Sequence, residues 1–459
     1  MLFTIPEFFL FFLVVFALVW NASSVTLRNG ILLVASYYFY AYWDIRFCSL
    51  LMLSTAIDFV VADRISKAST LVRRRLWLGI SLCANLGSLA FFKYCNFFID
   101  SFAVLLEPTG FHVQTLDIIL PVGISFYTFQ TLSYTIDVYR GRLDPCSSLL
   151  TFALYVSFFP QLVAGPIVRA SELLPQLACT PKWSSRRCYH GFQTALRGLV
   201  KKVLIADRLG EFVDVVFAGP DLYHGATVWL AVIAYAGQIY YDFSGYSDIA
   251  IGLAKMLGYR FPRNFRHPYL AVSVADFWHR WHMTLSRWLR DYVYITFGGN
   301  RRGGCRTFVN LMATMTLGGL WHGAAWTFVF WGIWHGAALC CQRAFRQTSL
   351  RVPKMFGWLL TTAVILFGWI LFRCDSLAHV QVVLRQLAFK DDGIAWYPPL
   401  AVLAILCMVI DHAVWSSRLR LSMRLPASKF YSPVLTAIMI WCLVLYAPRG
   451  FTPFVYFQF

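Results

Sequence analysis

The sequence TFVNLMATMTLGGLWHGAAWTFVFWGIWHGAALCC, residues 307–341, decides the fold class of this chain. It contains two apolar runs, 307–320 and 324–341, with His322 between them and His335 inside the second. Ionisable side chains at membrane depth are costly to bury, so each one that occurs there is a functional hypothesis. The stretch therefore predicts two membrane helices that carry functional histidines.

The composition extends this prediction to the whole chain. Of the 459 residues, 59% are hydrophobic and 14% are charged, whereas soluble proteins carry about 25% charged residues. Aromatic residues make up 18%, which suits a chain with many membrane–water boundaries. Because no polar stretch is long enough to be a soluble domain, we expect residues 1–459 to form a single integral-membrane domain.

A span of the bilayer takes roughly 20 apolar helical residues. The predicted fold is an all-α polytopic membrane protein with roughly 10–12 transmembrane or re-entrant helices around a central tunnel, plus interfacial helices. Pro121-Val122-Gly123 and Ala164-Gly165-Pro166 interrupt two spans, and broken helices at membrane depth indicate an enclosed cavity. The expected spans are 7–26, 30–43, 46–62, 76–98, 117–136, 148–166, 226–241, 307–320, 324–341, 355–372, 398–414 and 431–448.

Basic clusters predict the orientation. They occupy 64–75, 140–142 and 169–208, and cytoplasmic loops are enriched in Lys and Arg. Placing all three in the cytoplasm leaves the 107–117 loop and the N-terminus outside. No basic region precedes the first apolar run, so we interpret it as a spanning helix rather than a cleaved signal. The expected location is a membrane that borders the cytoplasm.

Residues 274–296 differ from the spanning segments. Seven side chains recur at helical spacing on one face, while Arg280 and Arg287 fall on the other. This pattern predicts an aromatic-rich helix at the cytoplasmic interface. His282 lies on its apolar face and is a candidate base, because imidazole takes a proton near neutral pH. The seven residues are Trp278, Trp281, His282, Leu285, Trp288, Leu289 and Tyr292.

The two Trp-His-Gly-Ala segments, 321–324 and 334–337, pose a choice. Thirteen residues of continuous helix give about 20 Å of rise and about 220° of rotation, so both histidines cannot share one reacting centre unless the helix breaks. Gly318 and Gly319 precede His322 and permit an irregular turn, which favours His322 as the base. The alternative is that both are core histidines with hydrogen-bond partners.

A polar group at 238–248 follows an apolar run. Tyr241, Asp242, Ser244 and Asp248 could line a substrate tunnel. They could equally form a self-satisfied network between helices, which is the more common role of any single residue of this kind.

Other functional classes find little support. The net charge of +18 comes from scattered loop clusters, so we expect no nucleic-acid partner. The twelve cysteines include no Cys-x-x-Cys pair, so neither a disulfide framework nor a metal site is expected. The sequence lacks a nucleophile elbow, a P-loop and a dinucleotide fingerprint. His112 and Asp117 match an acyltransferase spacing by chance, and Asp391-Asp392 lacks companion metal ligands.

Several motifs together resemble the membrane-bound O-acyltransferase (MBOAT) family, in its alginate O-acetyltransferase and teichoic-acid D-alanylation branch. The similarity covers most of the chain and is closest to the alginate type. One departure is His279, where relatives often carry Arg or Asn. The similar stretches are 123–130, 162–166, 241–248, 276–282, 290–294, 298–301, 318–324 and 453–459.

The resemblance implies that His322 is the essential histidine, in a tunnel that joins the two membrane faces, and that His282 is the second functional histidine. Trp321 and His335 are further candidates for the tunnel wall. Members of the family take an acyl group from a cytoplasmic thioester, here acetyl-CoA or an acyl-carrier thioester, and no tightly bound cofactor is expected. They deliver it to a hydroxyl outside, often through an extracytoplasmic acetyltransferase partner.

We therefore expect His322 to remove the acceptor proton, directly or through His282. Backbone donors at Gly318, Gly319 and Gly323 are candidates to stabilise the oxyanion. Three rival functions stay open: D-alanyl transfer to teichoic acid, a transporter or flippase without chemistry, and a metal-dependent glycosyltransferase.

Overall fold

The structure is a computed structural model that describes residues 1–106, 108, 114–348, 352–389, 392–416, 431–446 and 454. The described residues form helices and no β-strand, which confirms the all-α prediction. His112, Asp391 and most of the 453–459 ending lie outside these ranges. The chain divides into two compact units, Met1–Ala195 with Ile249–Pro262, and Leu196–Asp248 with Arg263–Phe459.

Three helical stretches of the described chain are long and apolar enough to cross a membrane: Ile45–Lys67, Leu71–Ala103 and Lys354–Arg373. Shorter apolar helices cover Pro6–Trp20, Pro399–Val414 and Ser432–Leu445. Because their apolar side chains suit a lipid environment, these helices support the prediction of a membrane protein.

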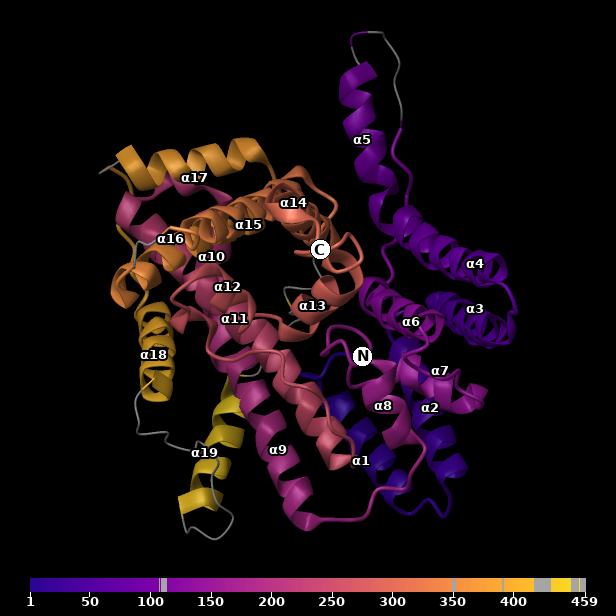
Figure 1. The fold of residues 1–459 in the computed structure, drawn as a ribbon. Coiled ribbons are helices and arrows are strands. Elements are labelled where there is room, and N and C mark those ends of the chain that lie inside the picture. Colours follow the sequence, from indigo (N-terminus) through magenta and orange to yellow (C-terminus); the bar gives the residue numbers. More distant parts are fainter. Residues whose placement is uncertain are drawn as a thin grey trace. The chain divides into compact units, whose positions relative to one another are not determined.

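The first unit begins with α1 (Pro6–Trp20) and α2 (Val25–Ala41), and Figure 1 shows the helices that follow them. Its α3 (Cys48–Lys67), α4 (Leu71–Leu89) and α6 (Ile124–Tyr139) pack around Asp58. The Asp58 carboxylate is fully buried and accepts hydrogen bonds from Ser81, Asn85 and Thr135. Such shared polar contacts fix which helices pair in an apolar environment. The remaining elements are η2 (Ala90–Tyr94), α5 (Cys95–Leu106), α7 (Leu149–Ser157), α8 (Ala170–Leu177), most of α9 (Ser185–Val200) and the end of α11.

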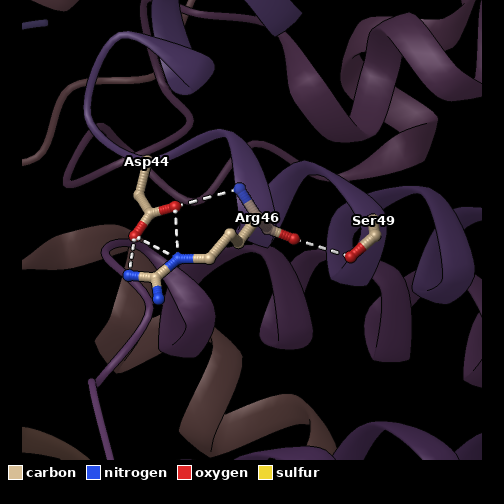
Figure 2. A network of polar contacts seen from close by, with 3 residues as sticks. All are labelled: Asp44, Arg46 and Ser49. Atoms are coloured by element: carbon tan, nitrogen blue, oxygen red, sulfur yellow. Dashed lines mark hydrogen bonds and ion pairs between the residues drawn. The ribbon is translucent and has the colours of Figure 1, made fainter.

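The turn between α2 and α3 is held by Asp44. Its carboxylate accepts from the backbone N–H of Arg46 at 2.9 Å and pairs with the Arg46 guanidinium at 2.6 Å, and the Arg46 carbonyl accepts from Ser49 (Figure 2). A side-chain acceptor at this position satisfies an N–H group that a helix start leaves unbonded. The short helix η1 (Ile45–Phe47) begins here.

The two Pro/Gly breaks were predicted correctly and lie together. Gly123 has φ +80, and a Cβ atom there would lie 2.8 Å from the carbonyl oxygen of Leu162. Two span boundaries were wrong, however. Helix α6 begins only at Ile124, and α7 ends at Ser157, so 148–166 is not one helix but a nine-residue helix followed by turns.

The second unit contains the 307–341 stretch. Helix α14 (Gly303–His322) and α15 (Trp326–Phe345) pack against each other, and α16 (Lys354–Arg373) packs against α15 (Figure 1). The unit also holds η4 (Lys201–Ala206), α10 (Asp207–Ala218), η5 (Pro220–Leu222), most of α11 (Gly225–Met256), η6 (Pro268–Leu270), α12 (Val274–Trp278), α13 (Met283–Trp288), η7 (Leu289–Tyr294), α17 (Leu377–Phe389), α18 (Pro399–Ser416) and α19 (Tyr431–Leu445).

The expected interfacial helix over 274–296 was wrong as a single element. It is three short pieces, α12, α13 and η7, with a break at 279–282 where His282 has φ +39. Three residues of the predicted apolar face, Trp281, His282 and Leu285, are buried, and His279 is exposed. The aromatic face therefore packs inward even though the helix is interrupted.

Candidate active site

Helix α14 ends at His322, and this end positions the imidazole. Gly323 is extended at φ −158, and α15 starts three residues later at Trp326. The helix therefore breaks between the two histidines, which is the condition under which both can approach one centre. His322 is 5% exposed.

The close packing of α14 on α15 explains the glycines around His322. A Cβ atom on Gly319 would lie 2.2 Å from the Phe328 carbonyl oxygen, and one on Gly332 would lie 2.5 Å from the Met315 carbonyl oxygen. A Cβ atom on Gly323 would lie 2.1 Å from the Phe328 ring. Only glycine allows two helix backbones to approach this closely.

An aromatic cluster surrounds His322. Its ring centroid lies 5.0 Å from Trp321, 5.1 Å from Trp331 and 5.2 Å from Phe372. Each pair is close to perpendicular, which is a favourable geometry for aromatic rings. The cluster fixes the plane of the imidazole, as a base with a defined direction of attack requires.

His335 contacts Trp331 of the same aromatic cluster. Its ring lies 4.7 Å from Trp331 and 5.2 Å from Trp278, and it is 1% exposed. Gly368 of α16 makes room for it, because a Cβ there would lie 2.6 Å from His335 Nε2. Both histidines thus share Trp331.

A cavity of about 480 Å³ opens beside His322. This volume lies in the usual range for small-molecule sites, about 300–1,000 Å³. His322, Gly318, Trp278 and Trp331 line one part of it, and polar residues line another: Ser286, Arg290, Gln342, Arg343, Arg346 and Gln347. The cavity thus joins an aromatic region that contains an imidazole to a cationic region.

The length of the cavity can be judged from the α15 residues that line it. Trp331 and Arg343 both line it and are twelve residues apart on one helix, which corresponds to about 18 Å of rise. The cavity is therefore long and narrow, with the arginines far from His322.

His282 lies next to this cluster but does not line the cavity. Its ring is 5.9 Å from Trp321 and 4.6 Å from Phe243. Trp321 contacts both His282 and His322, so the structure brings the two predicted histidines to the same indole ring.

Asn264 holds His282 in place, and sequence reasoning missed it. Its Oδ1 accepts from the N–H and Oγ1 of Thr284, at 3.2 and 2.9 Å, and lies 3.2 Å from His282 Nδ1. His282 Nδ1 also accepts from the backbone N–H of Leu285 at 3.4 Å, so its two neighbours favour different tautomers of the imidazole. Burial lowers the pKa of His282 to about 3, so the imidazole is neutral at physiological pH.

The 238–248 group is not part of the cavity wall. Asp242 pairs with Lys202 at 2.6 Å, and Asp248 pairs with Lys201 at 2.7 Å. Tyr241 and Ser244 are buried on the same helix, α11. These ion pairs favour the network interpretation for the two carboxylates, because a buried charge needs a partner.

The predicted oxyanion donors have other contacts. Gly318 lines the cavity, but Gly318 and Gly319 lie inside α14, where backbone N–H groups bond along the helix. The Gly323 N–H donates to the Gly319 carbonyl at 3.4 Å. A different donor is available in the wall: Trp278 Nε1 is buried and has no hydrogen-bond partner in the described part of the chain.

Comparison with known proteins identifies the fold family. The family model described as membrane-bound O-acyltransferase matches residues 143–381, a range that contains His282, His322 and His335. The chain belongs to the membrane-bound O-acyltransferase family. It is therefore a membrane enzyme that transfers acyl groups to oxygen, as the resemblance implied.

Individual relatives support this assignment. The probable alginate O-acetylase of Azotobacter vinelandii is 41% identical, over 82% of this chain and 76% of that protein. The peptidoglycan O-acetyltransferase of Helicobacter pylori is 37% identical, over 78% of this chain and 73% of its own length. The teichoic acid D-alanyltransferase of Bacillus subtilis is 27% identical, over 56% of this chain and 70% of that protein. O-acetylases are thus the more similar relatives among these three, and D-alanyl transfer is less favoured.

Proposed function

We propose that this enzyme moves an acetyl group from a cytoplasmic thioester towards hydroxyl groups of an exported polysaccharide such as alginate. The observation that carries the proposal is His322, buried in an aromatic cluster and lining a long cavity with arginines in its wall. The similarity to alginate O-acetylases supports the acetyl group and the acceptor class.

The chemistry assigned to His322 is general-base catalysis. The acceptor hydroxyl gives its proton to the imidazole while its oxygen forms a bond to the thioester carbonyl carbon. The C–S bond then breaks, and the leaving thiolate takes the proton from the imidazolium. A positioned base contributes about 10²–10⁴ in rate.

The oxyanion that forms during attack needs donors. We assign this role to the indole N–H of Trp278 together with the region around Gly318, which both line the cavity. Such donors act strongly where water is excluded. Gly319 and Gly323 remain weaker candidates, because packing accounts for them.

The donor fits the long cavity. Coenzyme A and acyl-carrier proteins both present their thioester on a phosphopantetheine arm, with an anionic phosphate at the far end. About 18 Å separates Trp331 from Arg343 along α15, which suits an extended arm. Arg343 and Arg346 would then meet the phosphate, as arginine commonly does.

Replacing His322 by Ala tests the active site. We expect His322→Ala to abolish acetylation of the polymer, because the base is lost. The protein should still insert into the membrane, because the substitution leaves the fold intact. The measurement is the O-acetyl content of isolated exopolysaccharide from cells that carry each variant. His279→Ala is the matched control, since His279 is exposed and outside the cavity wall. Near-normal acetylation in His322→Ala would remove this residue from the active site.

Replacing Arg343 and Arg346 by Gln tests the donor site. We expect KM for acetyl-CoA, or for the acetylated carrier, to rise about tenfold with little change in kcat, because the arginines bind the phosphate far from the reacting atoms. Arg306→Gln removes the same kind of charge from an exposed position that does not line the cavity. An unchanged KM for both donors would show that neither phosphate reaches these arginines.

The enzyme is expected to work in the inner membrane with its N-terminus outside, and to pass the acetyl group to a separate extracytoplasmic acetyltransferase. These statements rest on the basic loops and on the family resemblance. Loss of the gene should remove polymer acetylation; unchanged acetyl content would favour D-alanyl transfer or transport instead.

A further inference from the structure

A second cluster of polar side chains lies in the same unit as the active site and has no role in the chemistry above. His267 precedes η6, and Asp411 and His412 lie near the end of α18. One ligand atom from each of the three residues lies within 4.8 Å of the others. The cluster was invisible in the sequence because His267 is far along the chain from the other two residues.

The spacing between Asp411 and His267 is at the long end for a hydrogen bond and suits two ligands of one metal ion. Asp411 Oδ2 lies 3.5 Å from His267 Nδ1. N–H···O hydrogen bonds are about 2.7–3.2 Å long. Ligand atoms that share a tetrahedral Zn²⁺, at about 2.0–2.2 Å from the metal, stand about 3.3–3.5 Å apart.

His412 is oriented as a metal ligand usually is. Its Nδ1 lies 2.9 Å from the Met408 carbonyl oxygen and donates to it. Metal-binding histidines typically use one ring nitrogen in this way, which leaves the other as the ligand. The remaining nitrogen, Nε2, is buried and has no hydrogen-bond partner in the described residues, and the side chain is 95% buried (5% exposed).

The charge of the site also suits a cation. Asp411 contributes one negative charge, and two neutral imidazoles contribute none. The nearest lysine that acts on Asp411, Lys201, is paired with Asp248 at 2.7 Å. Two nitrogens and one carboxylate oxygen are ligands typical of Zn²⁺, whereas Mg²⁺ and Ca²⁺ prefer oxygen alone.

We propose that His267, Asp411 and His412 bind one Zn²⁺ ion, with a fourth position open to water. The ion would fasten α18 to the 263–273 loop. The same loop carries Asn264, which holds His282, so the site would act as a structural support of the active-site region. It departs from the sequence-based expectation of no metal site and does not depend on the proposed acceptor or donor.

The test uses the full-length protein in detergent, purified through a tag without histidines, at pH 8. At this pH an ordinary histidine is neutral, so a simple imidazolium–carboxylate pair would be absent. We expect calorimetric titration with Zn²⁺ to show one site per chain. Asp411→Asn and His412→Gln should each weaken binding at least about tenfold, whereas His224→Gln, a histidine elsewhere in the unit, should not.

Co²⁺ gives a second readout that does not need the variants to fold. In the wild-type protein we expect the visible absorption of tetrahedral Co²⁺ without a thiolate charge-transfer band. Three results would each overturn the proposal. They are the absence of a one-to-one site, equal Zn²⁺ affinity in the ligand variants and the control, and a thiolate band from the free cysteines. A fall in Tm on chelation that is absent from the Asp411→Asn variant would support it.

Discussion

His282 occupies a backbone conformation that few side chains tolerate. Its φ of +39 lies in the left-handed region, where residues other than glycine are strained and asparagine is the best tolerated. The side chain is fully buried and its Nδ1 faces Asn264. Asparagine therefore offers a conservative replacement that keeps both the backbone conformation and a polar side chain.

We expect His282→Asn to reduce transfer strongly and to lessen the acid sensitivity of the fold. The pKa of His282 is about 3 in the folded protein against 6.5 for an ordinary histidine, so the unfolded chain binds the extra proton. Stability from this group is present above pH 6.5 and lost as the pH falls towards 3. At pH 5.5 the lost stability amounts to about 1–2 kcal/mol.

The measurement is the difference in Tm between pH 7.5 and pH 5.5 for each detergent-purified protein. The wild type should lose more than His282→Asn. His279→Asn serves as a control, because His279 is exposed. Equal losses in wild type and His282→Asn would mean that the imidazole is not buried in its neutral form.

At the scale of single residues, the sequence proposed His322 and His282 as candidates but did not predict what surrounds them. Asn264 carries no local signal, since its partners Thr284 and His282 lie in another segment. Trp331 was identifiable only as one of many tryptophans, although its spacing of four from His335 places both on one helix face. Contacts between distant segments are not encoded in a local pattern.

The pair α14 and α15 is held by the glycines at its contact. A Cβ atom on Gly319 would meet the Phe328 carbonyl oxygen, which belongs to backbone and cannot move aside. Gly304, in the first turn of the same helix, has nothing within 4 Å of the equivalent position. The two glycines therefore provide a test of close packing within one helix.

We expect Gly319→Ala to separate α14 from α15, to lower stability by about 1–3 kcal/mol and to remove most activity, because His322 and Trp331 lie on the two helices. Gly304→Ala should be neutral or slightly stabilising, since alanine favours helix. Tm and polymer acetylation are the measurements. Equal behaviour of the two variants would contradict the close approach of the helices.

At the scale of elements, sequence patterns predicted helices well and some of their ends poorly. Apolar runs gave α3, α14, α15 and α16 close to their observed bounds. The end of α7 at Ser157 was missed because the chain stays apolar beyond it. The break before His282 was missed because it contains neither glycine nor proline.

For the whole molecule, the basic clusters predict which surface faces the cytoplasm. Cys179 is exposed within the 169–208 cluster, and Asp117 is exposed in the loop assigned to the outside. These two positions sit on opposite sides of the membrane if the assignment holds. A cysteine at either position is accessible to a thiol reagent, and the label is specific once the other cysteines are removed.

We expect a membrane-impermeant maleimide to label Asp117→Cys in intact cells, and Cys179 only after the membrane is permeabilised. Both positions are tested in a chain otherwise without cysteine. A chain that keeps only the buried Cys374 gives the background. The reverse pattern would invert the topology and place the donor on the other side.

The whole-molecule prediction that residues 1–459 form one membrane domain stays a prediction. Composition alone indicated an integral-membrane chain, and the family assignment agrees. The predicted central tunnel also stays a prediction, because hydropathy does not report packing between remote segments.

The two Trp-His-Gly-Ala segments end in different structures. In the first, Gly323 leaves the helix; in the second, Gly336 stays within α15, against Met312. A search for this tetrapeptide would count two equivalent sites, where the fold places one imidazole at a cavity and the other behind its wall. Annotation transfer for such chains should therefore depend on where the helix stops, rather than on the number of motif copies.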